Sequence, residues 1–374
     1  MRRPLLILVV TLALAVGAAW VGLELVRPYK ASAAHLVLEI PPGMHAPEVA
    51  SLLVERGVLA HRFPFLVRYY LGRPRHHLKA GEYLFDRPER PLDIYHKLIL
   101  GEVYLHPAVI PEGSDRFDIA RILHQQLGVP PDDFLRVTAQ AGPIRDLDPQ
   151  APSLEGYLFP DTYRLPRGVS AASAAAAMLA RFRHVLETKL RADLEASHAS
   201  LHDVVTLASL VEKETPDPAE RPVVAGVFAR RLEKGMPLQC DPTVIYAARL
   251  EGRPPGPITI SELQMDSPYN TYRYAGLPPG PIASPGEASL RAALQPAPGS
   301  VLYFVANNHG GHIFARTLAE HQRNVARYRR ALAALHPAAA ENPSPRRTPS
   351  PRSHPGESHG RKQPSKAHPK TDHP

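Results

Sequence analysis

The chain has 374 residues, of which 44% are hydrophobic and 21% charged, and its formal net charge is +8. This is an ordinary globular composition, long enough for two domains with appendages. The positive charge lies at the ends, because residues 1–30 carry a net +3 and residues 337–374 a net +4, which leaves +1 for the middle. A nearly neutral centre argues against a basic groove for phosphates, so we expect no nucleic-acid partner.

The chain begins with a candidate membrane anchor. Residues 5–23 form an uncharged apolar run, LLILVVTLALAVGAAWVGL, preceded by Arg2 and Arg3. At helical rise such a run spans roughly 28 Å, about one bilayer core. The arginines predict a cytoplasmic N-terminus, with Trp20 at the outer interface. We expect a cytoplasmic stub at 1–4, a single-pass anchor at 5–25 in the cell (inner) membrane, and a periplasmic or otherwise extracytoplasmic remainder.

A cleaved signal peptide is the alternative interpretation of this segment. Small residues at 17–19 or at 31–33 would suit a signal peptidase. The apolar run is longer than a usual signal-peptide core, which favours the uncleaved anchor. Both interpretations export the chain.

Two segments repeat at an offset of seventy residues, with IPPG at 40–43 and IPEG at 110–113. Each predicts the end of a strand, a turn and an amphipathic helix. We expect strands at 36–40, 83–85 and 103–110, with helices near 63–71 and 92–100. Residues 36–105 are therefore predicted to form a small α/β module that resembles the LysM-like glycan-binding module. The pattern leaves open whether it binds sugar or is a fold unit without a ligand.

Residues 106–335 are predicted to form a larger mixed α+β domain, so the overall class is α+β. DPAE at 217–220 predicts a helix with Asp217 as its N-cap that ends at Gly235. Further helices are expected to begin at Asp241 and near 284–287. Short strands at 301–305 and 313–315 flank NNHGG, a hairpin pattern, and a last helix is expected from Thr317 to about 335.

The segment 336–374 is rich in Pro, Ser and basic residues and has almost no apolar content. Such a segment buries too little surface to offset its ordering entropy. We predict a disordered, basic, Pro-rich tail.

One predicted helix carries two glutamates. Val204, Leu207, Ala208 and Val211 fall on one face, and Glu212 projects from the edge of that face. Glu214 should point to the far side, into solvent, because two residues turn a helix by about 200°. Partial burial raises the pKa of a carboxyl group, as a glycosidic general acid requires. Periodicity alone leaves open whether Glu212 is catalytic or part of a buried salt bridge.

Residues 207–215 read LASLVEKET, which resembles the signature of the MltG-type (YceG-like) endolytic murein transglycosylases. Further blocks resemble the same family in the same order: EGYLFPDTY at 155–163, RL…GMPLQCDPTVIY at 231–246, SPYNTY at 267–272, GLPPGPI at 276–282, and YFV with GGHIF at 303–314. The resemblance covers essentially residues 5–335. One departure is Cys240, where the family pattern has Ser or Thr, and a thiol is the poorer hydrogen-bond partner.

The resemblance implies cleavage of the β-1,4 bond between N-acetylmuramic acid and N-acetylglucosamine in nascent peptidoglycan strands, leaving 1,6-anhydro ends and limiting strand elongation. It assigns the acid/base role to Glu212. Asn270 and Tyr272 are candidates for holding the substrate acetamide or orienting Glu212. Weaker candidates for the cleft wall are Gln239, Asp241, Glu155 and Tyr157. Loop structure is the competing interpretation of these residues, with Asp241 as an N-cap and Asn270 in a turn.

No cofactor or metal is expected. His309, His312 and His321 lack the spacing of a zinc motif, and with a single cysteine no disulfide within the chain and no cysteine-based metal site is possible. Expected partners are peptidoglycan strands, the membrane and the peptidoglycan synthases.

Two other functions are open. A lysozyme-like hydrolase would need a second carboxylate near Glu212, for which Asp241, Asp161 and Glu155 are the candidates. A non-catalytic scaffold of the synthesis machinery would bind strands without needing Glu212.

Overall fold

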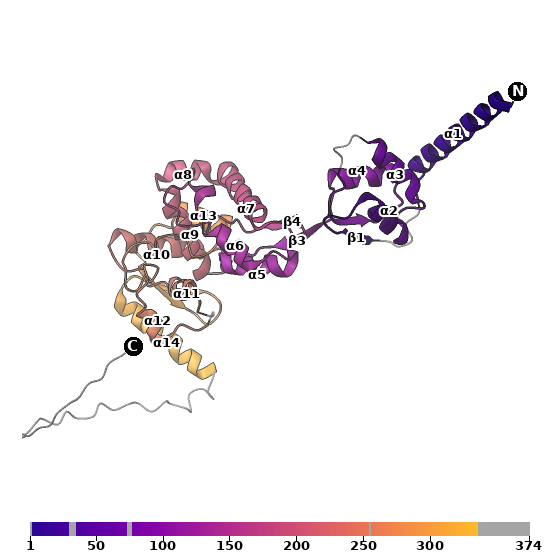
Figure 1. Cartoon of the computed structure of the whole chain (residues 1–374). Helices are drawn as coiled ribbons and strands as arrows, with labels where there is room; N and C mark the ends of the chain where they lie inside the picture. Colours follow the sequence, from indigo (N-terminus) through magenta and orange to yellow (C-terminus); the bar gives the residue numbers. More distant parts are fainter. Residues whose placement is uncertain (1, 30–34, 73–76, 254–255, 336–374) are drawn as a thin grey trace, which may run out of the picture.

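The structure, a computed structural model, describes residues 2–29, 35–72, 77–253 and 256–335. It is a mixed α+β fold in which a long N-terminal helix, a small module and a larger body follow one another along the chain (Figure 1). The predicted tail at 336–374 and one candidate peptidase site at 31–33 lie outside the described residues.

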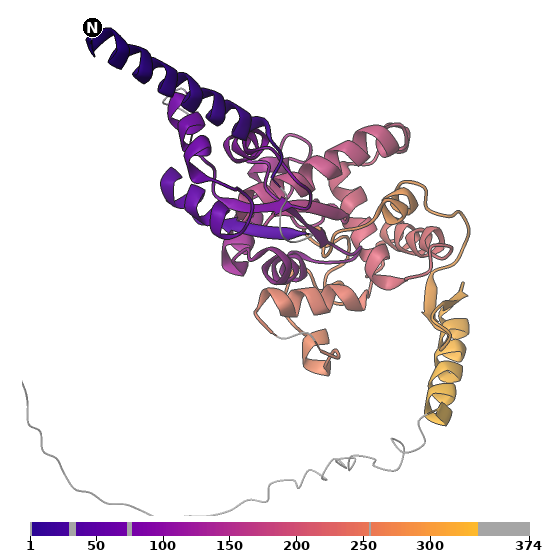
Figure 2. The same ribbon diagram turned by 90° about the vertical axis from the view of Figure 1, so that its right-hand side faces the viewer.

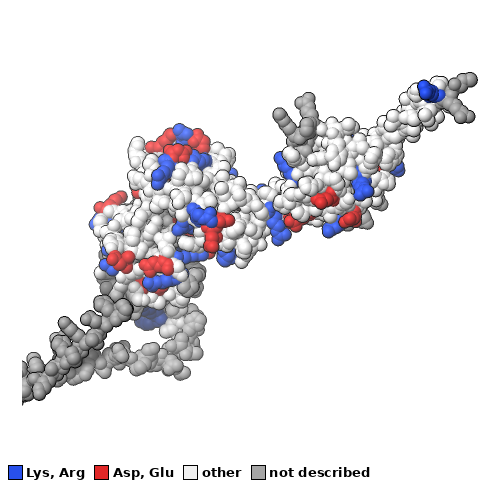
Figure 3. Space-filling model, in the orientation of Figure 1, with Lys and Arg blue, Asp and Glu red and all other residues white. Residues whose placement is uncertain are grey.

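Helix α1 (Arg2–Val26) is the long N-terminal helix. It is apolar on all sides, and most of its side chains are exposed, with Leu12 and Leu14 among the most exposed, so only its C-terminal end is covered by the rest of the protein. In the described part of the chain it is the one helix long and apolar enough to cross a membrane. Figure 3 shows it as an uncharged rod with a basic tip. A helix that is hydrophobic all round suits a bilayer, which confirms the predicted apolar segment.

The small module contains β1 (Leu36–Ile40), α2 (Ala46–Glu55), α3 (Arg62–Leu71), β2 (Gly81–Phe85) and α4 (Pro91–Leu100). β1 and β2 pair antiparallel, with Leu38 opposite Tyr83. Their inward side chains join Leu53, Phe65 and Tyr95 in a core separate from that of the larger body. The strand–helix–helix–strand order was predicted from the alternating and helical apolar patterns. Likeness to LysM modules stays a prediction.

The larger body begins with β3 (Leu105–Val109), which pairs antiparallel with β4 (Thr162–Pro166). α5 (Arg116–Leu127) follows, and the Asp115 side chain caps it by accepting hydrogen bonds from the Phe117 and Asp118 amides. The repeated I-P-x-G turn therefore leads from strand to helix in both halves. Its glycines, Gly43 and Gly113, have φ of +83° and +73°, where a side chain would be strained.

The rest of the body is mostly helical. It contains α6 (Pro131–Thr138), a 3₁₀ turn (Gly142–Ile144), α7 (Ala171–Val185), a π-helical turn (Leu186–Leu190), α8 (Arg191–Ser197), α9 (Leu201–Glu214), α10 (Arg221–Glu233), α11 (Asp241–Leu250), α12 (Ile260–Leu263), α13 (Glu287–Leu294), β5 (Tyr303–Ala306), β6 (His312–Ala315) and α14 (Leu318–Leu335). α9 is central, packing against α10, α11 and α13, and residues 204–211 are all buried. The β5–β6 hairpin lies against α14 at the edge of the body (Figure 2).

Two predicted helix caps differ from the structure. α10 begins at Arg221 with Glu220 as N-cap, whereas Asp217 lies in a preceding turn and accepts the Ala219 amide at 2.9 Å. α11 begins at Asp241, but Cys240 is its N-cap, so Asp241 is the first helical residue. In both cases the Asp-Pro pair marks the region of the helix start correctly, yet the local turn decides which residue caps it.

Candidate active site

The last turn of α9 carries both glutamates, and they have different surroundings. The Glu212 carboxylate accepts a hydrogen bond from Arg221 Nη2 at 3.0 Å and another from the Gly286 amide at 3.0 Å. Its side chain is 5% exposed, and Arg221 is 8% exposed. Glu112, from the second I-P-x-G turn, contacts the same Arg221 nitrogen at 3.5 Å. We call Glu112, Glu212, Arg221 and Gly286 the Arg221 clamp. It joins the end of α9 to the starts of α10 and α13.

Glu214 lines a cavity of about 320 Å³ on the other side of the helix end. Its carboxylate accepts a hydrogen bond from the Cys240 thiol at 3.5 Å. Burial raises the pKa of Glu214 to about 7. The expectation that Glu214 points into solvent was therefore wrong. Helical periodicity places the side chain away from the apolar face, but the 238–241 segment and the β5–β6 hairpin, distant in sequence, cover that side.

The cavity is built from four separate stretches of chain. Besides Glu214 its lining residues are Arg231, Leu238, Gln239, Asp241, Tyr272, Phe304, Val305, Ala306, His312 and His321. Three of these, Gln239, Asp241 and Tyr272, are predicted site residues, and the Tyr272 hydroxyl donates a hydrogen bond to Asp241. The structure therefore brings these three together around Glu214 rather than around Glu212.

Basic groups form the wall opposite Glu214. Arg231 is buried and donates to the backbone oxygens of Leu302 and Leu238, both at 2.8 Å, so its position is fixed. Burial lowers the pKa values of Arg231 and of His321. His312 contacts Glu220 through Nδ1 at 2.7 Å, which ties the hairpin to the start of α10. The cavity thus combines a carboxyl group of raised pKa with fixed hydrogen-bond donors.

Asn270 does not face this cavity. Its side chain is fully buried, its amide donates to the backbone oxygens of Leu263 and Met265, and its oxygen accepts the Tyr272 amide. These contacts give no support to the prediction that Asn270 holds the substrate acetamide or orients Glu212. All of these contacts stabilise the loop that carries Tyr272. They agree with the alternative interpretation, in which Asn270 stabilises a turn.

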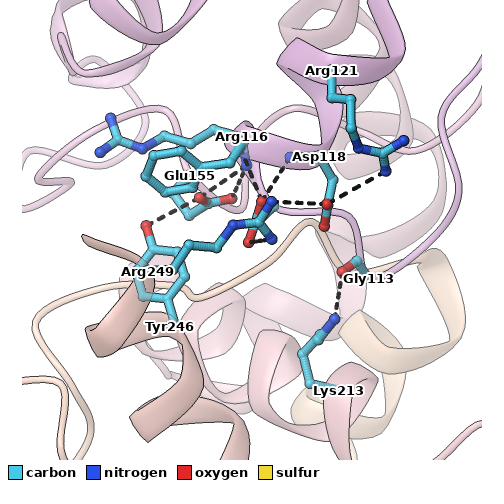
Figure 4. Close-up of polar contacts among 10 residues, drawn as sticks. Gly113, Arg116, Asp118, Arg121, Glu155, Lys213, Tyr246 and Arg249 are labelled. Carbon is cyan, nitrogen blue, oxygen red and sulfur yellow. Dashed lines mark hydrogen bonds and ion pairs between the residues drawn. The ribbon is translucent and has the colours of Figure 1, made fainter. Parts of the chain in front are cut away.

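Glu155 and Tyr157, the other candidates for the cleft wall, are also buried and do not line this cavity. Glu155 accepts hydrogen bonds from the Arg116 amide and from the Tyr246 hydroxyl at 3.0 Å, beside the Arg249–Asp118 ion pair (Figure 4). Burial raises the pKa of Glu155 to about 8. Tyr157 donates to Asp148 in the core. Glu155 and Tyr157 therefore have structural roles, because each satisfies the hydrogen bonding of other buried polar groups.

Sequence reasoning missed several residues of the cavity and of the clamp: Glu112, Glu214, Arg221, Arg231, Phe304 and His321. Glu214 stands in the same LASLVEKET block as Glu212, so the block itself was the available signal. His312 stands in the GGHIF block but was considered only as a metal ligand. Within the described residues no cluster of three or more His, Cys, Asp and Glu side chains has the arrangement of a metal site.

Known proteins resemble the chain over most of its length. A family model described as the YceG-like family matches residues 38–327. The endolytic murein transglycosylase of Bacillus subtilis strain 168 is 32% identical over 331 residues, which cover 83% of this chain and 90% of that protein. The endolytic murein transglycosylase of Streptococcus pneumoniae D39 is 29% identical over 333 residues, covering 79% of this chain and 58% of that protein.

A solved structure gives the same assignment. The crystal structure of a YceG-like protein from Listeria monocytogenes matches with a TM-score of 0.54 and 33% identity, over 78% of this chain and 99% of that one. The family model alone spans more than half of the chain. The chain therefore belongs to the YceG-like family.

Proposed function

We propose that the chain is an endolytic peptidoglycan lytic transglycosylase and that Glu214 is its catalytic acid and base. Its relatives from Bacillus and Streptococcus carry the name endolytic murein transglycosylase. The observation that carries the proposal is the Glu214 carboxyl group, which lines a polar cavity and has a pKa raised to about 7 by burial. Glu212 does not suit this role, because two donors occupy it and its side chain is 5% exposed.

One carboxyl group is sufficient for the reaction. Protonated Glu214 donates its proton to the oxygen between the two sugars as the bond from that oxygen to C1 of the muramic acid breaks. The resulting carboxylate then accepts the proton of the muramic C6 hydroxyl as that oxygen bonds to C1. The proton returns to Glu214, a 1,6-anhydro end forms, and no water is consumed. A pKa near the working pH favours both transfers.

The other cavity residues supply substrate contacts in this proposal. Gln239 and Asp241 are exposed at the cavity, and Tyr272 lies beside Asp241. Their amide, carboxylate and hydroxyl groups suit the hydroxyl and acetamide groups of an amino-sugar chain. Arg231 also lines the cavity and would donate a hydrogen bond to a carbonyl or hydroxyl oxygen of the glycan.

Hydrolysis is the competing reaction, because Asp241 is a second carboxylate in the same cavity. Digesting purified glycan strands in ¹⁸O-labelled water separates the two. A transglycosylase gives anhydro ends without the label, 18 mass units below the unlabelled reducing ends of a hydrolase. Labelled reducing ends would replace the proposal by hydrolysis. No product from the wild type, under conditions where strands still bind, would favour the scaffold function.

The remaining proposals concern location. We place the N-terminus in the cytoplasm, α1 across the membrane and the cavity outside the cytoplasm, where peptidoglycan is made. Peptidoglycan synthases are the proposed protein partners, and the small module is the proposed LysM-like contact with the glycan.

A further inference from the structure

Helix α3 of the small module has two apolar faces. Phe65, with the partly buried Leu66 and Tyr69, packs into the core of the module. A second stripe, formed by Phe63, Val67, Tyr70 and Leu71, follows the i, i+4, i+7, i+8 spacing of one helix face. Phe63 is 57% exposed, Tyr70 66% and Leu71 80%. Apart from the ring contacts of Phe63 with Trp20 and of Tyr70 with Tyr69, the stripe is left largely uncovered by the described residues.

The stripe begins against the anchor. The ring of Phe63 stacks on Trp20 of α1, with centroids 6.4 Å apart, and His61 lies 5.9 Å from the same ring. After α1 the chain is fastened to the module by a hydrogen bond from the Tyr29 amide to the Glu89 oxygen at 3.2 Å. The contacts of α1 with α3 and α4 therefore set the module directly on the outer end of the anchor (Figure 1).

The position of Trp20 fixes the depth of this contact. Trp20 stands three residues before Leu23, the last residue of the apolar run, so it lies about 4.5 Å inside the apolar end of the helix. If residues 5–23 fill the bilayer core, a ring stacked on Trp20 lies just inside the boundary between the acyl chains and the head groups. Arg27 and Arg62, which are exposed close by, can contact lipid phosphates.

We propose that the Phe63–Leu71 stripe of α3 rests in the head-group region of the lipid leaflet through which α1 emerges. The occupant is the phospholipid surface, because the stripe continues the apolar surface of α1 and basic side chains border it. An apolar helix face of this kind inserts to about 5–10 Å. The inference rests on the proposed anchor and is independent of the glycan chemistry. Docking would hold the module in one orientation on the membrane, with the larger body on its far side (Figure 1).

The test uses the full chain in vesicles of phosphatidylethanolamine and phosphatidylglycerol. In a Cys240→Ser background, single cysteines are introduced as Leu71→Cys on the stripe, Leu12→Cys in the anchor and Val37→Cys on the exposed face of β1. Each carries an environment-sensitive fluorophore, and lipids with a nitroxide near the head group quench it. We expect quenching at position 71 at least about threefold above that at position 37, as the depth of an interfacial helix requires.

The matched perturbation is Phe63→Glu, which places a charge in the stripe. We expect it to reduce quenching at position 71 to the level at position 37, while a deep nitroxide still quenches position 12. If position 12 is quenched but positions 71 and 37 are quenched equally, the docking proposal is overturned while the proposed membrane anchor stands. Failure to quench position 12 would overturn both, and the ¹⁸O experiment would still test the enzyme.

Discussion

Two carboxyl groups two residues apart on α9 have opposite environments. Glu212 is enclosed by the Arg221 clamp, where a guanidinium and a backbone amide satisfy it. Glu214 borders a cavity, receives one hydrogen bond from a thiol, and has a pKa raised to about 7 by burial. The comparison indicates that an enclosed, paired carboxylate such as Glu212 stabilises the fold, whereas a desolvated carboxyl group at a cavity, such as Glu214, is the candidate for proton transfer.

Glu155 is a third carboxyl group, and it shows that burial and access to the cavity are separate properties. Burial raises its pKa to about 8, yet it is 1% exposed and contacts only protein groups. A raised pKa alone is therefore not a sign of catalysis. Access to the cavity distinguishes Glu214 from Glu155, and the absence of a fixed cation partner distinguishes it from Glu212.

The largest expected effect is that of Glu214→Gln on activity. Removing a general acid and base costs about 10²- to 10⁴-fold in rate, and strand binding should persist because the amide keeps the shape. Glu212→Gln is the matched variant and should retain most activity while lowering stability. Release of anhydro ends per unit time measures both. An inactive Glu212→Gln beside an active Glu214→Gln would reverse the assignment.

The next effect concerns stability. Arg221→Gln leaves the buried Glu212 carboxylate without its cation, and breaking a buried pair costs about 3–5 kcal/mol. Arg253→Gln is the control, because its pair with Glu251 has the same 3.0 Å distance but both side chains are 45% exposed. An exposed pair contributes about 0–1 kcal/mol. Urea unfolding should show the difference, and equal losses for the two variants would remove the clamp as a structural feature.

Cys240→Ser should shift the pH dependence of activity. A hydroxyl donates a stronger hydrogen bond to the Glu214 carboxylate than a thiol does, which favours the ionised form and lowers its pKa. Since the acid must start protonated, the alkaline limb of the rate profile should move to lower pH, by less than about one unit. Cys240→Ala should move it the other way. The neighbouring titratable groups Arg231, Asp241 and His312 remain in every variant.

A further effect is a change in how stability depends on pH. Glu155 has a folded-state pKa of about 8 against an ordinary value of 4.5, so between these values the unfolded chain has lost a proton that the folded chain keeps. Stability is therefore full below pH 4.5 and falls as the pH rises towards 8. Glu214 contributes with the same sign. Glu155→Gln should flatten the fall, and an unchanged slope in thermal unfolding would contradict the assignment.

Local sequence patterns predicted much of the fold. Residues 36–40 and the helices near 63–71 and 92–100 agree with β1, α3 and α4 because apolar spacing and turns determine them locally. The site was harder to predict. The family motifs include Asn270, Glu155 and Tyr157, which are buried and stabilise loops and the core. A sequence motif alone does not show whether a residue has such a structural role or contacts substrate.

The surroundings of the Glu214 side chain depend on parts of the chain that are far from α9 in the sequence. Its cavity is closed by Arg231, by Tyr272 and by the β5–β6 hairpin, none of which enters the helical pattern of 204–212. Gln239, Asp241 and Tyr272, which the family resemblance suggested as substrate contacts, do line this cavity. Sequence thus located the helix end beside the cavity and three of its lining residues, but of the two glutamates it chose Glu212, whereas Glu214 is the one that lines the cavity.

The most direct test is a titration of the Glu214 carboxyl group itself. The full chain labelled with ¹³C at glutamate carboxyl carbons is titrated in detergent micelles, and the Glu214 signal is identified by its loss in Glu214→Gln. We expect a midpoint at about pH 7, the value that burial gives this group. A midpoint at its ordinary value of 4.5 would show a carboxylate already ionised at neutral pH, which cannot donate the proton.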